Sequence, residues 1–346
     1  MKFSFWDFIK VQFAVQTPVA TADLTGKTVL VLGANTGIGF QAATHFAKMN
    51  AERLILACRS ESKGQAALNK LKAETGYERA ELWLVDLADF SSVQRFADKF
   101  ERDGGRLDIL VENAAIGVFA YETTKDGWES NLQVNSLAGP LLALLLLPIM
   151  VNTANQHATT PRIVVVTSGV HYWHTFEKSL CEDPAVLKTL GSKEYCTPQK
   201  MGDRYPLTKL LNVFFVRALN ARLAPATPLI VNAVCPGYCY SELRRHWSGV
   251  LALMDHLMEL VLALTPEQGS RQLVWGAVAH EAHPEALCGA YISSAHVVEA
   301  SDFVLSAQGA KVQDRVWDNM VEILGKIDPR VTVNVEKYLS YNVGLP

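Results

Sequence analysis

The chain has 346 residues, of which 49% are hydrophobic and 19% charged, and its formal net charge is −3. This composition is typical of a globular protein with a sizeable core, and without a basic block it argues against nucleic acid as a partner. The closest cysteines, Cys235 and Cys239, have no second pair or histidines at metal-ligand spacing, so no metal site is expected. Scattered cysteines fit a reducing compartment, and we expect a cytoplasmic protein.

Residues 1–23 are rich in aromatic side chains and are expected to form an N-terminal extension. Asp7 and Lys10 interrupt the apolar residues, so the layout of a signal peptide is missing. We expect an amphipathic stretch that packs onto the protein's own body. The alternatives are peripheral contact with a membrane and a face shared with a second copy, so the chain is expected to be a monomer or a homodimer.

Residues 27–40 read KTVLVLGANTGIGF and predict a strand, a glycine-rich turn and the start of a helix. The apolar run before the first glycine suits a strand that is buried on both faces. Gly33, Gly37 and Gly39 would let a phosphate approach backbone N–H groups at the positive end of the helix dipole. A tight turn without a ligand has the same glycine spacing, but the position between a strand and a helix favours nucleotide binding.

Strand-like and helix-like segments alternate up to about residue 293. The predicted strands that follow the first are residues 53–58, 80–85, 108–111, 161–167, 229–234 and 289–293. Helical spacing of apolar residues is found at 61–74, 91–100, 126–152, 205–223 and 308–326. This alternation predicts an α/β fold with one Rossmann-type, doubly wound domain over residues 24–300, in which helices flank a seven-stranded parallel sheet. Residues 301–346 are expected to be a C-terminal helical extension.

Two apolar segments invite comparison with membrane spans. The run from Leu137 to Val151 is shorter than the ~20 residues that a bilayer span needs, and it contains two prolines. The segment at 250–264 is interrupted by Asp255 and Glu259. We therefore expect a buried core helix and an amphipathic helix, and no integral membrane segment.

Residues 169–204 and 238–264 are long excursions that we expect to wall a substrate pocket. They carry polar and aromatic candidates for substrate contact, namely His171, Tyr172, Trp173 and Tyr238. These side chains favour a bulky, mostly apolar small molecule as the substrate. The alternative is that the aromatic residues pack the loops onto the body and that His171 is hydrogen-bonded locally.

Tyr205 and Lys209 stand four residues apart on a predicted helix and therefore share one face. The ordinary pKa of tyrosine is ~10, and a neighbouring ammonium lowers it because it favours the phenolate. Such a pair can transfer a proton to a carbonyl or from an alcohol. Ser168 follows a predicted strand, at the edge where open α/β sheets place their ligands, so its hydroxyl could hold the substrate oxygen. Asn135 lies among leucines and needs hydrogen-bond partners there, either backbone groups or a water.

The residues after the second predicted strand bear on which dinucleotide such a glycine turn would bind. An acidic residue there would bind the ribose 2′-OH of NAD and repel a 2′-phosphate. Arg59 instead offers a planar set of donors suited to phosphate, and Lys63 adds positive charge, whereas Glu61 opposes them. We expect NADP(H), and the alternative is that Arg59 is a solvated surface residue.

Taken together, these motifs resemble the short-chain dehydrogenase/reductase family over about residues 24–293. The closest likeness is to its retinol-dehydrogenase-like and WW-domain-oxidoreductase-like branch, and to fungal members of secondary metabolism, on the residues 57–60, 205–210 and 241–243. The resemblance implies a catalytic set of Asn135, Ser168, Tyr205 and Lys209. The implied cofactor contacts, with Arg59 and Lys63 added on the charge argument, are Gly33, Asn35, Thr36, Gly37, Ile38, Gly39, Arg59, Lys63, Asp86, Leu87, Asn113, Ala114, Tyr205, Lys209, Pro236 and Gly237.

The expected reaction is hydride transfer between NADPH and the carbonyl carbon of a bulky ketone of polyketide type. Ser168 and Tyr205 would hold the carbonyl oxygen, which Tyr205 protonates, and Asn135 would position a relay water. Lys209 would lower the pKa of Tyr205 and, by the resemblance, bind the nicotinamide ribose. Two alternatives remain, which are cyclisation or dehydration without redox chemistry and a sensor that binds NADP without turnover. Glu112 and Ala115 stand where the family usually has asparagine and glycine, in a supporting element.

Overall fold

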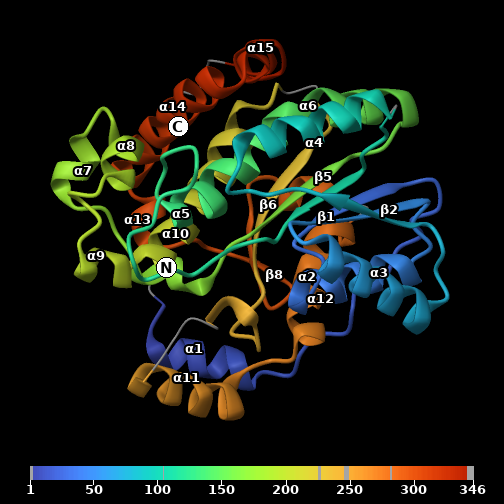
Figure 1. Cartoon of the computed structure of the whole chain (residues 1–346), viewed down its shortest axis with the longest axis horizontal. Coiled ribbons are helices and arrows are strands. Elements are labelled where there is room, and N and C mark those ends of the chain that lie inside the picture. The colour runs from blue at the N-terminus through green and yellow to red at the C-terminus, as the bar shows by residue number, and fades with distance from the viewer. Residues whose placement is uncertain (1–2, 104, 225–226, 245–248, 281–282, 341–346) are drawn as a thin grey trace.

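The structure is a computed structural model, and it describes residues 3–103, 105–224, 227–244, 249–280 and 283–340 (Figure 1). Its strands are β1 Thr28–Leu32, β2 Arg53–Cys58, β3 Ala80–Leu84, β4 Ile109–Glu112, β5 Arg162–Val166, β6 Ile230–Cys235, β7 Tyr291–Ser293 and β8 His296–Val298. The first helices are α1 Phe5–Phe13, α2 Gly37–Lys48, α3 Glu61–Thr75, α4 Phe90–Arg102, α5 Ser130–Leu132, α6 Ala138–His157, α7 Lys178–Glu182 and α8 Val186–Gly191. The later helices are α9 Pro198–Gly202, α10 Arg204–Arg222, α11 Gly249–Leu262, α12 Pro266–Val278, α13 Asp302–Leu305, α14 Ala307–Ile327 and α15 Pro329–Tyr338. Gln133–Leu137 is a π-helical turn, and 3-10 turns are found at Gly169–Trp173, Glu242–Arg244 and Pro284–Leu287.

The sheet has the strand order β3-β2-β1-β4-β5-β6-β7-β8, and every neighbouring pair is parallel except β7 and β8. The chain thus builds outward from β1 to β3, crosses over, and continues from β4 in the other direction. The strand order reverses between β1 and β4, and in open α/β sheets the ligand crevice lies outside the carboxyl ends of such strands. The predicted doubly wound α/β fold is confirmed.

The predicted number of seven strands, all parallel, is wrong because β8 adds an eighth, antiparallel strand. A two-residue turn joins β7 to β8, and its residues Ser294 and Ala295 have φ values of 53° and 57°. Positive φ at both positions is typical of a type I′ hairpin turn, which usually carries Asn-Gly or Asp-Gly. Ser-Ala gives no such signal, so the hairpin was not visible in the sequence.

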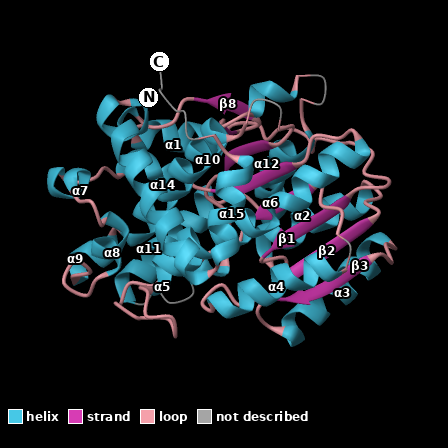
Figure 2. Ribbon diagram, turned by 90° about the horizontal axis from the view of Figure 1, so that it is seen from above, coloured by secondary structure: helices cyan, strands magenta, loops and turns pink. Residues whose placement is uncertain are grey.

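Each face of the sheet has its own hydrophobic core. On one face, residues of β1, β2, β5 and β6 pack against α2, α3 and α12. On the other face, the core includes α4, α6 and α10 and extends outward to α14 and α15 (Figure 2). This two-sided burial explains why the parallel strands read as continuous apolar runs rather than as alternating patterns.

The apolar helical stretch that includes α6 is a core helix, as expected. Residues Ser130–His157 are long and apolar enough to cross a membrane, but 94% of the most apolar window is buried inside the fold. Asn334 of α15 also reaches this helix, where its side-chain amide donates to the carbonyl of Leu144 at 2.9 Å.

The excursion at 169–204, which was expected to be irregular, contains the 3-10 turn Gly169–Trp173 and the three short helices α7, α8 and α9. Beyond the sheet, α14 packs on α10 and α8, and α15 packs on α14 and α6. The helix predicted at 308–326 is α14, and α15 lies within the expected helical extension, although its bounds were not predicted. At the opposite end of the molecule, α1 and α11 lie side by side (Figure 1).

Candidate active site

The glycine turn follows β1 at the point where the strand order reverses, which is where open α/β sheets bind their ligands. Gly33 and Gly37 have φ values of +73° and +60°, which favour glycine over any residue with a side chain. A Cβ on Gly39 would lie 2.4 Å from Nδ2 of Asn113 and 2.5 Å from the carbonyl oxygen of Gly33, so that position must be glycine for packing. A Cβ on Gly37 would meet nothing within 4 Å. The turn is thus tightly packed on the side that faces Asn113. It is open at Gly37, the first residue of α2, where an anion can reach the helix N-terminus.

Asn113 and Ala114 hold the glycine turn from the neighbouring strand. The Asn113 side-chain amide donates to the carbonyl oxygens of Leu32 and Gly33, each at 3.2 Å. Cα and Cβ of Ala114 lie 3.0 Å from the position that a Cβ on Gly33 would occupy. The adjacent carboxyl of Glu112 is buried, and burial raises its pKa to about 8, so it is mostly protonated at pH 7.

The residues expected around the adenosine end of a nucleotide lie where β2 and β3 end. Arg59 is exposed just after β2. Lys63 lies in the first turn of α3, exposed, with its Nζ 4.0 Å from Oε2 of Glu242. Asp86 accepts a hydrogen bond from the N–H of Ala88 at 3.0 Å, and Leu87 is buried in the core. Asn35 and Ile38 are half-buried, and Thr36, the N-cap residue of α2, is exposed.

Lys209 is buried within α10, and its ammonium donates to the carbonyl oxygen of Val166 at 2.8 Å. Nζ lies 5.4 Å from the ring centroid of Tyr205, one helical turn earlier. Burial lowers the pKa of Lys209 to about 8, because an ammonium loses its hydration there. Tyr205 itself is half-buried. The sequence-predicted pair therefore shares one face, with the amine directly beside the phenol.

Asn135 lies in the π-helical turn, and its side-chain amide is hydrogen-bonded to other residues of the protein. Its Oδ1 accepts from the N–H of Ile116 at 2.8 Å, and its Nδ2 donates to the Ile116 carbonyl at 2.9 Å and to Oγ1 of Thr208 at 3.1 Å. Thr208 in turn donates to the carbonyl oxygen of Tyr205 at 2.9 Å. The asparagine thus fixes the loop after β4 against the first turn of α10. Thr208 was not predicted as a site residue, because a threonine inside a helix gives no signal of its own.

Ser168 comes two residues after the end of β5 and caps the 3-10 turn that follows, where its Oγ accepts from the N–H of Val170 at 3.4 Å. His171 is fully buried, and its Nδ1 lies 2.8 Å from the carbonyl oxygen of Ser168. The N–H of Ser301 donates to Nε2 of His171 at 3.3 Å, so the ring proton is assigned to Nδ1. Burial lowers the pKa of His171 to about 4, and the ring stays neutral. His171 is hydrogen-bonded locally, which was the alternative to substrate contact.

The turn after β6 brings Pro236 and Gly237 to the same end of the sheet. Gly237 has a φ of +82°, and a Cβ there would lie 3.1 Å from Oε1 of Gln12. Both residues help to line a small hollow, together with Val11, Gln16, Cys235, Leu264, Gln272, Ser293 and Ser294. The predicted substrate residues Tyr172, Trp173 and Tyr238 all contact aromatic residues from the start of the chain.

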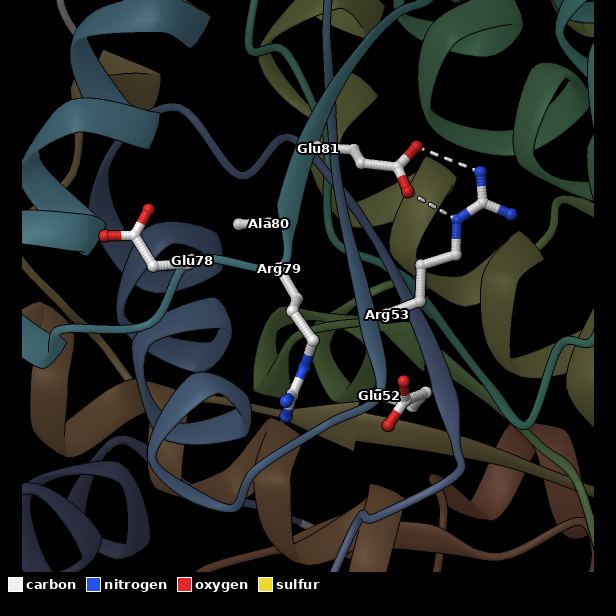
Figure 3. A pocket seen from close by; sticks show the side chains of 6 residues that line it. All are labelled: Glu52, Arg53, Glu78, Arg79, Ala80 and Glu81. Atoms are coloured by element: carbon white, nitrogen blue, oxygen red, sulfur yellow. Dashed lines mark hydrogen bonds and ion pairs between the residues drawn. The ribbon is translucent and has the colours of Figure 1, made fainter.

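A second hollow lies at the amino ends of β2 and β3, opposite the crevice (Figure 3). Arg53 donates there to both carboxylate oxygens of Glu81 at 2.6 and 2.9 Å, and the side chain of Arg79 points away from this pair. The charged groups of Arg53 and Glu81 thus satisfy one another at a surface that none of the predicted site residues reaches.

A buried ion pair at the start of α10 was also missed in the sequence. Nε of Arg204 donates to Oε2 of Glu129 at 2.6 Å, and both side chains are 1% exposed. Glu129 also accepts from the backbone N–H groups of Asn131 and Leu132, each at 2.9 Å. The pair therefore joins the residue before Tyr205 to the start of the helical stretch that carries Asn135. A charged residue beside a tyrosine does not reveal a partner 75 positions away.

Known proteins of one family are similar to this chain along most of its length. The profile of the family described as short chain dehydrogenase matches residues 27–176. A short chain dehydrogenase/reductase of Cryptosporiopsis sp. is 36% identical, over 94% of this chain and 99% of that protein. A short-chain dehydrogenase of Penicillium roqueforti is 33% identical, over 94% of this chain and 84% of that protein.

Among solved structures, a variant of the actinorhodin polyketide ketoreductase with NADPH is similar with a TM-score of 0.57. Its identity is 19%, over 79% of this chain and 97% of that chain, so it supports the fold alone. The two fungal relatives match nearly the whole chain at more than 30% identity. The chain therefore belongs to the short-chain dehydrogenase/reductase family.

Proposed function

We propose that this protein is an NADPH-dependent reductase of a bulky, mostly apolar ketone, with Asn135, Ser168, Tyr205 and Lys209 as its catalytic set. The observation that carries the proposal is the buried amine of Lys209 beside the ring of Tyr205, 5.4 Å from its centroid. An ammonium so close favours the phenolate, which brings the phenol nearer to the range of a general acid at neutral pH.

The residues of the crevice fit a dinucleotide. The open position at Gly37, the positive end of α2 and the close packing at Gly39 allow a pyrophosphate to approach backbone N–H groups. Arg59 and Lys63 supply two cations beside the place expected for a 2′-phosphate, which favours NADP(H) over NAD(H). When bound, the nicotinamide supplies the hydride.

Residues of the chain would bind the carbonyl oxygen and supply the proton. The hydroxyls of Ser168 and Tyr205 would bind the carbonyl oxygen, and the Tyr205 hydroxyl would give its proton to that oxygen as the alcohol forms. Lys209 would hold down the pKa of Tyr205, and Asn135 would keep the loop after β4 and α10 in register and position a relay water. The names of the fungal relatives, a dehydrogenase/reductase and a dehydrogenase, give no direction of reaction and no substrate.

The cofactor assignment is tested by titrating NADPH and NADH into the wild-type chain and into an Arg59→Ala variant. We expect the Kd of NADPH to rise roughly tenfold in the variant, since one charge-assisted contact is lost, and the Kd of NADH to change little. Lys72→Ala is the control, because Lys72 lies exposed in the last turn of α3, away from the start of that helix. Equal losses for both nucleotides would contradict the assignment to the 2′-phosphate.

The reaction class is tested by following nicotinamide absorbance with NADPH and a panel of aliphatic and aromatic ketones. Oxidation of NADPH that depends on the ketone supports the proposal. NADPH binding without turnover of any ketone would favour a sensor, and a ketone consumed without NADPH oxidation would favour cyclisation or dehydration.

A further inference from the structure

The first helix, α1, is fastened to the loop after β6 through one buried glutamine. Nε2 of Gln12 donates to the carbonyl oxygens of Tyr238 and Leu262, each at 2.8 Å, and its Oε1 accepts from the N–H of Tyr238 at 3.0 Å. The side chain is 6% exposed. A buried amide is costly unless it is hydrogen-bonded, and both ends of this one are satisfied by backbone groups 226 to 250 positions away.

These bonds join both ends of the segment 238–264. The N–H of Leu264 donates to the carbonyl of Tyr238 at 2.8 Å, and the N–H of Tyr240 donates to the carbonyl of Leu264 at 3.0 Å. Gln12 extends this small ladder by one more side chain. The helix α1 is therefore hydrogen-bonded to both ends of the segment 238–264, which is predicted to wall the substrate pocket.

Aromatic side chains from the start of the chain complete the same wall. The ring of Phe3 stacks on Tyr172 with centroids 5.0 Å apart, and the indole N–H of Trp173 donates to the carbonyl of Phe3 at 2.9 Å. Phe8 meets Trp173 and Tyr238 edge-on, at 6.1 and 6.0 Å. Two phenylalanines thus bridge the excursion after β5 and the loop after β6.

This aromatic cluster, formed by Phe3, Phe8, Tyr172, Trp173 and Tyr238, reaches the residue that follows Ser168 through Phe3. A Cβ on Gly169, the residue after Ser168, would lie 3.8 Å from Cε1 of Phe3. At the other side, Gln12 touches Gly237, which follows β6. A substrate whose carbonyl is held by Ser168 would therefore extend past Phe3 toward Phe8.

We propose that α1, fastened by Gln12, is part of the substrate site, and that Phe3 and Phe8 select planar, ring-bearing ketones over small acyclic ones. The inference rests on the proposed function, since it concerns the ketone of that reaction. Aromatic faces and edges contact flat rings favourably, whereas a small acyclic ketone is too short to reach them.

The selectivity is tested with tetralone, a bicyclic aryl ketone, and butanone, a small acyclic one, using a Phe3→Ala/Phe8→Ala double variant. We expect KM for tetralone to rise about tenfold, while KM for butanone and Kd for NADPH stay within twofold of the wild type. Phe13→Ala is the matched control, because Phe13 belongs to the same helix but is 65% exposed, and it should leave all three values unchanged.

The attachment of α1 to the loop after β6 is tested by hydrogen exchange of the Gln12→Leu variant, a measurement that does not depend on enzyme activity. Peptides that cover 238–240 and 262–264 should exchange faster than in the wild type, whereas a Gln65→Leu control on the exposed face of α3 should not change them. Unchanged exchange in Gln12→Leu, or equal changes of KM for both ketones in the double variant, would overturn the inference alone. A wild-type chain that binds NADPH and reduces no ketone would overturn the proposed function, and the inference about substrate with it.

Discussion

The buried ammonium of Lys209 is costly for the fold and useful for the proposed chemistry. It has one hydrogen bond to the protein, to the Val166 carbonyl, and burial lowers its pKa from 10.5 to about 8. At pH 7 the group is therefore charged at a cost of at most about 3 kcal/mol, by the conversion of ~1.4 kcal/mol per pKa unit.

Replacing Lys209 by Met should separate stability from activity. We expect the free energy of unfolding at pH 7 to rise by about 1–3 kcal/mol, since a charge is replaced by an apolar chain of similar shape, and turnover to fall by roughly 100-fold or more. The gain should shrink as pH rises from 8 to 10.5, because the folded wild type then sheds its proton before the unfolded chain does. Urea unfolding across this range measures it, and a variant less stable than the wild type at pH 7 would contradict the argument.

His171 gives a second pH dependence, in the acid range. Its pKa is lowered from 6.5 to about 4 in the fold, so the unfolded chain binds a proton that the folded chain does not between these values. This residue should therefore cost the wild type about 2 kcal/mol of stability between pH 7 and pH 5. A His171→Gln variant should lose correspondingly less over the same interval in urea unfolding. Equal losses in the two proteins would show that His171 does not titrate as its burial implies.

At the scale of elements, the geometry of the candidate site depends on contacts between helix starts. Arg204 and Glu129 join the first turn of α10 to α5, and Asn135 and Thr208 join the π-helical turn to the same first turn. Both links act on the backbone that carries Tyr205. The carboxylate of Glu129 also accepts hydrogen bonds from two backbone N–H groups, so the same side chain pairs with Arg204 and caps α5.

Breaking this ion pair should be expensive. Arg204→Met leaves the Glu129 carboxylate buried beside an apolar chain, and we expect a loss of about 3–5 kcal/mol in the free energy of unfolding. The control is Lys326→Ala, which removes an exposed i,i+4 pair with Glu322 and should cost less than ~0.5 kcal/mol. Chemical unfolding of both variants measures the difference. Similar, small losses in the two would mean that the buried pair is not coupled to the fold as described.

The elements that the sequence predicted are those with strong local patterns. The apolar runs of β1 to β6 and the amphipathic spacing of α14 are set by residues next to one another. In contrast, β8 depends on a turn without the usual residues, and Gln12 depends on backbone groups more than 220 positions away. Neither arrangement leaves a signal in the order of amino acids alone.

The residues of the candidate site fall into the same two groups, those with a local sequence pattern and those that depend on distant partners. The glycine turn, Ser168, Tyr205 and Lys209 could be located from motif spacing and from the ends of strands. His171 could not be placed from the sequence, because only the fold brings the backbone of Ser301 to its ring. The partners of Arg204 and Asn135 were hidden for the same reason.

For the whole molecule, two cores hold the sheet, and the segments before β1 and after β8 are packed onto it. We propose that residues 24–300 form the catalytic domain, with 1–23 and 301–346 as extensions. Through α1, the first extension contacts the loop after β6, whereas α14 packs on α10 and α15 packs on α6 (Figure 1). The proposed nicotinamide-dependent reduction requires Tyr205 as its acid.

The most direct measurement of that claim compares wild type and Tyr205→Phe in parallel for NADPH binding and ketone turnover. We expect the Kd of NADPH to stay within about twofold, because the ring and the Lys209 amine remain in place, and turnover to fall by a factor on the order of 100 to 10,000. Full turnover in the Tyr205→Phe variant would contradict the account.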